Sequence, residues 1–184
     1  MRRLALLAAA ILLLTGMHWP QRWHWPGPGA ASSYDPDQTW VYFQRTNRNH
    51  DLYLRHFRFV DWAAVQWRRS PRVAIRVVDR CPTNANCVRF VTRDIDAIGK
   101  TTIWIGGNRH LLSATVRFHP VVGTAELGTA LSREAACFES MLALGGGWDS
   151  PTTALNEHSI GCNGSGYPTA HDYAALAEVY DHLH

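Results

Sequence analysis

The stretch from Arg133 to Trp148 constrains the fold more than any other part of this chain. Its apolar residues recur at helical spacing, along two adjacent lines of one helix face. The first line is Cys137, Met141 and Leu144, and the second is Ala135, Phe138 and Leu142. Ser132 is the predicted N-cap, and Gly145, which opens a run of glycines, is the predicted C′ residue. The stretch therefore predicts a buried helix that ends in a sharp glycine turn.

This helix resembles the active-site helix of the metzincin zinc peptidases, above all the small secreted matrixin-like enzymes. The pattern of that family is His-Glu-x-x-His-x-x-Gly-x-x-His. Laid on this pattern, Glu139 takes the general-base position and Gly145 the position of the turn glycine. The three zinc-ligand positions fall on Phe138, Leu142 and Trp148, whose side chains offer zinc no usable lone pair. The resemblance thus implies a metzincin-like fold in which these three residues form a small hydrophobic cluster instead of a zinc site.

A second stretch, Asn163 to Tyr173, resembles the segment that leads into the C-terminal helix of matrixin-type enzymes. Thr169 and Asp172 have the spacing of a capping box, so we expect a final helix within Tyr167 to His184. The loop Ile160 to Asn163 lacks the methionine that metzincins place beneath the metal. This departure agrees with the loss of the zinc site.

Length and composition predict one domain. The chain has 184 residues, of which 46% are hydrophobic and 18% charged, enough for one proper core. We assign residues 1–16 to a signal peptide or N-terminal anchor, 17–38 to a linker rich in Trp, Pro and Gly, and 39–184 to the metzincin-like domain. The formal charge of +3 includes Arg2 and Arg3 of the first segment. The folded part is therefore near neutral, which argues against nucleic acid as a partner.

The N-terminus predicts export. Two arginines precede an apolar run from Leu4 to Leu14, which has the length of a signal peptide and is too short to span a bilayer. Cleavage near Gly16 or near Ala30 would release an extracellular protein. The alternative is a retained, membrane-tethering anchor, with Trp19, Trp23 and Trp25 at the membrane interface.

Four cysteines agree with export, because an even number in an exported chain favours disulfides over free thiols. They allow three pairings. The resemblance implies the pairs Cys81 with Cys87 and Cys137 with Cys162. A four-cysteine metal site is disfavoured because the chain contains no Cys-x-x-Cys pair.

The remaining pattern predicts an α+β fold of the zincin or metzincin type. We expect a mixed, twisted sheet of about four to five strands packed on the central helix, a preceding helix and a C-terminal helix. The strands are expected at Thr39–Thr46, Arg72–Val78, Val88–Val91, Thr101–Ile105 and Leu111–His119, and the preceding helix at Leu54–Arg69. In the resembled family the strand bordering the cleft binds substrate by strand addition. We therefore expect a peptide-binding sheet edge within residues 101–119.

The favoured hypothesis is an exported, non-catalytic pseudopeptidase with a binding or structural role and no cofactor. In it Glu139 is vestigial, and its burial without a cation raises its pKa. One alternative is an active zinc endopeptidase with unconventional ligands, such as Asp149, His158 and His171. Another is an unrelated secreted α+β binding domain. Structural calcium at Asn84 and Asn86 is disfavoured because the ligand spacing of an EF-hand is absent.

Overall fold

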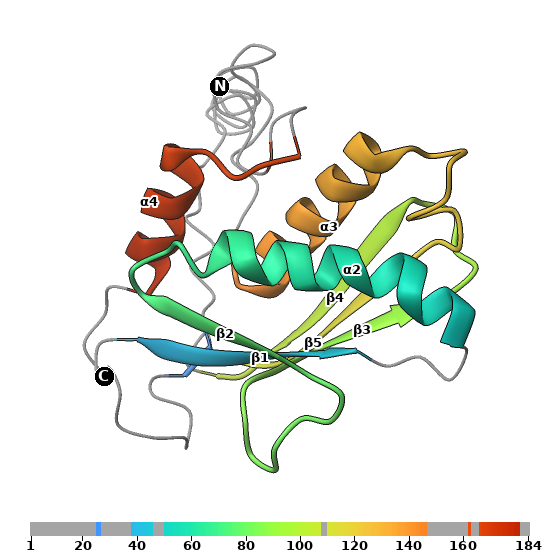
Figure 1. Ribbon diagram of the computed structural model, residues 1–184. Coiled ribbons are helices and arrows are strands. Elements are labelled where there is room, and N and C mark those ends of the chain that lie inside the picture. The colour runs from blue at the N-terminus through green and yellow to red at the C-terminus, as the bar shows by residue number, and fades with distance from the viewer. Residues whose placement is uncertain are drawn as a thin grey trace, which may run out of the picture.

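The protein is seen here in a computed structural model, which describes residues 25–26, 38–45, 50–107, 110–146, 162 and 166–180. In the first helix, side chains are described from residue 58 onward. The helices gather on one side of a single sheet (Figure 1). In chain order the elements are β1 (Thr39–Arg45), α2 (His50–Trp67), β2 (Val73–Val78), β3 (Cys87–Thr92), β4 (Gly99–Ile105), β5 (Leu111–Phe118), α3 (Thr129–Ala143) and α4 (Ala170–Val179).

The sheet has five strands in the order β2-β1-β3-β5-β4. Neighbouring strands run parallel except for β4, which pairs antiparallel with β5 at one edge. Alternate residues of each strand face the helices, and on β1 and β3 these are large apolar side chains. Val41, Phe43, Val88 and Phe90 are all buried in the core. The predicted α+β class with a mixed sheet is confirmed. Among the described strands β4 lies at an edge of the sheet, and peptide binding at that edge stays a prediction.

The central helix begins earlier than the sequence predicts. Its N-cap is Gly128, with φ of 79°, and not Ser132. The Ser132 hydroxyl instead accepts a hydrogen bond from the Gly123 N–H at 2.9 Å and donates to the Gly128 carbonyl at 2.7 Å. The prediction was wrong because this buried serine holds the preceding turn against the first turn of the helix.

The two other helix ends with predicted capping residues are confirmed. Gly145 follows α3 with φ of 95°, and its N–H bonds the Leu142 carbonyl while the Gly146 N–H bonds that of Met141. This double pattern is a Schellman motif. At α4, Thr169 and Asp172 form the capping box, with each side chain bonded to the backbone N–H of the other.

Three aromatic side chains from distant parts of the chain donate hydrogen bonds to carbonyls of α3 and its C-cap. The Trp67 indole donates to Cys137 at 3.2 Å, the Trp25 indole to Ala143 at 3.0 Å, and the Tyr180 hydroxyl to Leu144 at 2.7 Å. The last carbonyls of a helix lack intrahelical partners, so two of these bonds satisfy groups that burial would otherwise leave unpaired. Burial raises the pKa of Tyr180, which keeps its hydroxyl a donor.

Trp25 is the main departure from the predicted domain organisation. It falls within 17–38, the segment predicted as a linker, yet only 1% of its surface is exposed and it belongs to the hydrophobic core. The adjoining Pro26 carbonyl accepts a hydrogen bond from the Asn86 side chain. At this point the predicted linker is part of the domain.

Both disulfides implied by the resemblance are present. Cys81 pairs with Cys87 across a loop, with a Cα–Cα distance of 6.2 Å. Cys137 pairs with Cys162 at 5.9 Å, and both residues are fully buried. The second bond ties α3 to a residue 25 positions later in the chain.

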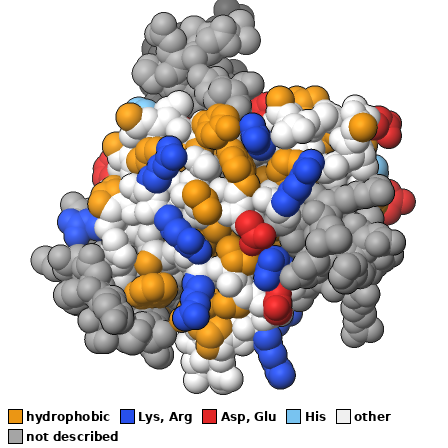
Figure 2. Space-filling model, viewed as in Figure 1, with side chains coloured by type: hydrophobic (Ala, Val, Ile, Leu, Met, Phe, Trp, Pro, Cys, Tyr) orange, Lys and Arg blue, Asp and Glu red, His pale blue; other side chains and the backbone are white. Residues whose placement is uncertain are grey.

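The surface visible in Figure 2 carries Lys and Arg side chains interspersed with hydrophobic ones, and acidic side chains are sparser. No helix within the described part of the chain is long and apolar enough to cross a bilayer. The predicted signal segment, the cleavage region, Trp148 and residues 149–161 lie outside the described residues.

Candidate functional site

The carboxyl group of Glu139 lies between α3 and the edge strand β4. Only 6% of the residue is exposed. One carboxyl oxygen lies 2.6 Å from the Thr101 hydroxyl, and the same hydroxyl lies 3.0 Å from the Glu139 backbone carbonyl. The side chain therefore joins the helix to the strand at the place where the resemblance puts a general base.

Gly99 makes room for this contact. A Cβ atom at position 99 would lie 2.6 Å from Cγ of Glu139 and 2.8 Å from one of its carboxyl oxygens. Such distances are too short for real atoms, so any larger residue would force the Glu139 side chain out of its place. Sequence reasoning did not single out Gly99 or Thr101, although a glycine inside a strand is a known sign of close approach by another group.

The geometry around Thr101 indicates which form of Glu139 it fits. A threonine hydroxyl has one proton, so it can donate to only one of its two Glu139 neighbours at a time. If the carboxyl is protonated, it can donate to the Thr101 oxygen while the hydroxyl donates to the backbone carbonyl. Burial raises the pKa of Glu139, and the hydrogen bonds from Thr101 oppose this only in part. Both observations indicate that Glu139 stays protonated, and therefore neutral, to a higher pH than an exposed glutamate does.

The substitution Glu139→Gln tests this protonation state. Because the folded pKa is raised, the stability that Glu139 contributes is fully present below its unfolded pKa and is lost as pH rises through the folded pKa. Each unit of elevation corresponds to about 1.4 kcal/mol. We expect the variant to gain stability relative to the parent between pH 4 and pH 8, measured by urea unfolding. If the stability of the variant relative to the parent stays constant or falls as pH rises, the assignment is contradicted.

The side chains at the first two zinc-ligand positions do not fit zinc. Phe138 and Leu142 are partly buried and pack against the hydrophobic core, one helical turn apart on α3. A phenyl and an isobutyl group provide no metal donor. Trp148, the third position, lies outside the described residues, so the expected three-residue cluster stays a prediction. Neither of the two described positions therefore offers a ligand to the catalytic zinc of the resembled family.

The alternative ligands do not assemble a site within the described ranges either. His171 is exposed on the first turn of α4, while Asp149 and His158 lie outside those ranges. Among the described residues, no three His, Cys, Asp or Glu side chains come together in a way that could hold a metal ion. In the loop proposed for calcium, the Asn86 amide donates hydrogen bonds to the Pro26 and Trp40 carbonyls. That amide thus acts as a structural donor.

Comparison with known proteins does not decide between a pseudopeptidase, an active zinc peptidase and an unrelated binding domain. No family model, curated protein or solved structure matches this chain.

The strand next to Glu139 has a free edge in the sheet. β4 pairs with β5 on one side, and no described strand pairs with it on the other. Near its end, Trp104 is 66% exposed and Ile105 38% exposed. An edge of this kind presents backbone N–H and C=O groups to an added strand. The candidate site thus combines the buried carboxyl group of Glu139 with an edge strand, β4, whose backbone groups could pair with a peptide.

Proposed function

We propose that this protein is an exported, metzincin-like pseudopeptidase, which binds extended peptide along β4 and does not cleave it. The observation that carries the proposal is the position of Glu139. Its carboxyl group is buried against Gly99 and bonded to Thr101. A general base must reach a water molecule and the substrate. This carboxyl is instead used to hold α3 to β4.

The binding half of the proposal rests on the sheet edge. Backbone groups supply the affinity in strand addition, and side-chain pockets supply the specificity. Both β2 and β4 are edge strands of the described sheet. Of these two strands, β4 is the one bonded to α3, through the Thr101 hydroxyl and the Glu139 carbonyl. β4 is also the one with an exposed indole near its end, that of Trp104. Strand addition at β4 therefore agrees best with the resemblance.

Two further features support the metzincin-like and exported parts of the proposal. α3 ends in a glycine turn at Gly145, where the resembled family turns its chain toward the third ligand position. Both cysteine pairs are disulfides, which persist in oxidising compartments and are rare in the cytosol.

We expect the purified protein to bind peptide without cleaving it. With zinc added and a mixed-sequence peptide library as the probe, mass spectrometry should detect no chelator-sensitive cleavage. Amide hydrogen exchange should slow in β4 on addition of the library, because an added strand pairs its free N–H groups. β2 is the matched control, since it is also an edge strand of the described sheet but lies at the opposite edge from β4.

Two results would contradict this proposal. Cleavage that both a chelator and the variant Glu139→Ala abolish would show an active zinc peptidase. Exchange that slows equally in β2 and β4, or in neither strand, would refute strand addition at β4. The two readouts are independent, so loss of catalysis and peptide binding are judged separately.

A further inference from the structure

The sheet face opposite the helices carries a pocket that shares only Trp104 with the features used for the proposed function. Its volume is about 570 Å³, within the usual range for small-molecule sites. A loop between β2 and β3 forms one wall, and the ends of β4 and β5 form the other. The lining includes two arginines, Arg80 and Arg89, the disulfide pair Cys81 and Cys87, and two exposed apolar residues, Trp104 and Leu112.

Strand alternation separates this pocket from Glu139. Thr101 faces α3, so its neighbours Thr102 and Lys100 face the other side of the sheet. Arg89 and Thr115 lie opposite each other in the register, and Thr115 also lies opposite Thr102. The pocket therefore lies on the opposite face of the sheet from Glu139.

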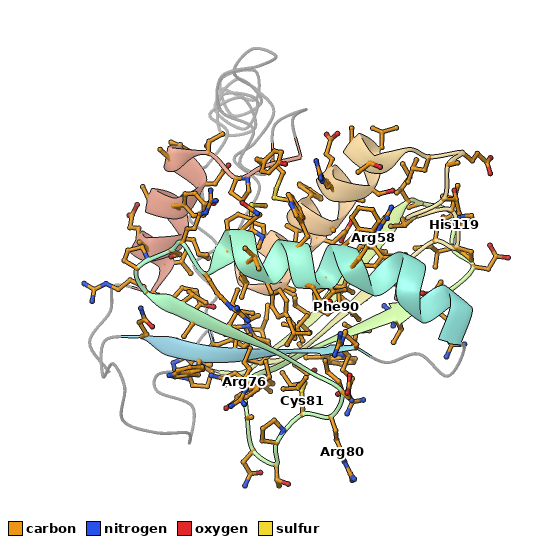
Figure 3. All side chains as sticks on the ribbon, in the orientation of Figure 1. Arg58, Arg76, Arg80, Cys81, Phe90 and His119 are labelled. Carbon is orange, nitrogen blue, oxygen red and sulfur yellow. A yellow bond between two sulfur atoms is a disulfide. The ribbon has the colours of Figure 1, made fainter. Side chains whose placement is uncertain are left out.

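The pocket is positively charged. Arg80 and Arg89 both line it and both are exposed, and no acidic residue is among the lining residues. Arg76 and Arg80 lie on the side of the sheet away from the helices, as Figure 3 shows. Arg117, on the same face, donates a hydrogen bond to Thr102 at 2.8 Å. Guanidinium groups bind phosphate and sulfate oxygens through paired N–H donors, so the pocket favours an oxyanion.

An exposed aromatic ring stands at the rim. The Trp104 side chain is 66% exposed although it lies within a strand. The register of β4 and β5 shifts between Trp104 and Ile105, and Leu112 is the residue left without a partner. Leu112 also lines the pocket and is 66% exposed. An indole in such a position offers a flat apolar surface on which a ring can stack.

The loop wall is held in place before any ligand arrives. The disulfide Cys81–Cys87 closes the loop, and both cysteines line the pocket. At its far end, the Asn86 amide donates hydrogen bonds of 3.0 Å to the Pro26 and Trp40 carbonyls. Because this loop is already ordered, it loses little conformational entropy when a ligand binds.

We propose that this pocket binds a small ring compound bearing a phosphate or sulfate group. Arg80 and Arg89 bind the oxyanion, Ser113 and Thr115 add hydroxyl donors, and the ring stacks on Trp104. A nucleoside monophosphate and a sulfated monosaccharide both have this chemistry. The pocket is large enough for one such monomer.

Isothermal titration calorimetry at physiological ionic strength tests the proposal. The probes are adenosine monophosphate, glucose 6-sulfate, their uncharged parents adenosine and glucose, and inorganic phosphate. We expect one charged ring compound to bind at least tenfold more tightly than its uncharged parent. Which of the two binds identifies the source of the oxyanion. Inorganic phosphate should bind more weakly, because it does not reach Trp104.

Variants assign the contacts. Arg89→Ala should weaken binding of the preferred compound at least tenfold. Arg76→Ala is the matched control, because it removes the same charge from the same face but Arg76 does not line the pocket. Trp104→Ala should weaken binding of the ring compound and leave that of inorganic phosphate unchanged. Thermal melts of each variant confirm that it is folded.

Three outcomes would overturn the proposal. The first is that neither charged ring compound binds at millimolar concentration. The second is that Arg76→Ala weakens binding as much as Arg89→Ala, which would show a diffuse charge effect. The third is that the uncharged parents bind as tightly as the charged compounds.

Discussion

Replacing Trp25 with alanine is expected to lower the free energy of unfolding by about 3–5 kcal/mol, the usual cost of emptying a large aromatic site. The indole is 1% exposed, packs in the core and donates a hydrogen bond to the Ala143 carbonyl. The substitution thus removes both packing and the partner of a helix-end carbonyl. Urea unfolding followed by circular dichroism measures the loss.

Trp104→Ala is the matched control, because the same side chain is removed at a position that is 66% exposed. We expect it to change stability by no more than about 0.5 kcal/mol. Trp25→Phe separates the two contributions, since it keeps most of the packing and loses only the N–H donor. If Trp25→Ala and Trp104→Ala have equal effects, residue 25 is not part of the core.

The position of Trp25 bears on the predicted export. Of the two cleavage regions considered, cleavage near Ala30 would remove Trp25 and its core contacts, whereas cleavage near Gly16 would keep them. Mass spectrometry of protein recovered from the medium gives the mature N-terminus directly. Under the export proposal we expect it upstream of residue 25.

Removing the disulfide between Cys137 and Cys162 is expected to cost about 3 kcal/mol of stability. The bond closes 25 residues, and in the chain-entropy model a loop of that length contributes roughly this amount. The double variant Cys137→Ala with Cys162→Ala should therefore melt roughly 6–12 °C lower than the parent. Differential scanning calorimetry measures the shift.

The other disulfide provides the comparison. Cys81 and Cys87 are only 6 residues apart, so their bond restricts the unfolded chain less. The double variant Cys81→Ala with Cys87→Ala should lose less stability. An equal loss in both variants would show that loop entropy does not govern the effect. No loss in the Cys137 variant would contradict the prediction outright.

Elements with strong local patterns could be predicted from the sequence. The alternation in β2, the apolar periodicity of α3 and the capping box of α4 each depend on residues a few positions apart. The structure confirms all three elements. The two cysteine pairings came from the family resemblance, since spacing alone left three possibilities open.

Features made by residues far apart in the chain could not be predicted. Trp25 is isolated among prolines and glycines, and only its contact with the end of α3 makes it a core residue. Ser132 fits the sequence pattern of an N-cap, but its hydroxyl bonds a turn that sequence reasoning treated as loop. The buried position of the Glu139 side chain depends on Gly99 and Thr101, which lie on β4 and not on α3. The basic pocket likewise draws residues from four strands and a loop.

The aromatic hydrogen bonds on α3 and its C-cap set an order on folding. Their donors are Trp25, Trp67 and Tyr180, which lie 118, 70 and 36 residues from their acceptors. Contacts of long sequence separation form late, because the closure entropy of large loops must first be offset. Until Trp25 and Tyr180 are both in place, the Ala143 and Leu144 carbonyls at the end of α3 lack these donors. The C-terminal end of α3 is therefore expected to be one of the last parts of the domain to reach its final hydrogen bonding.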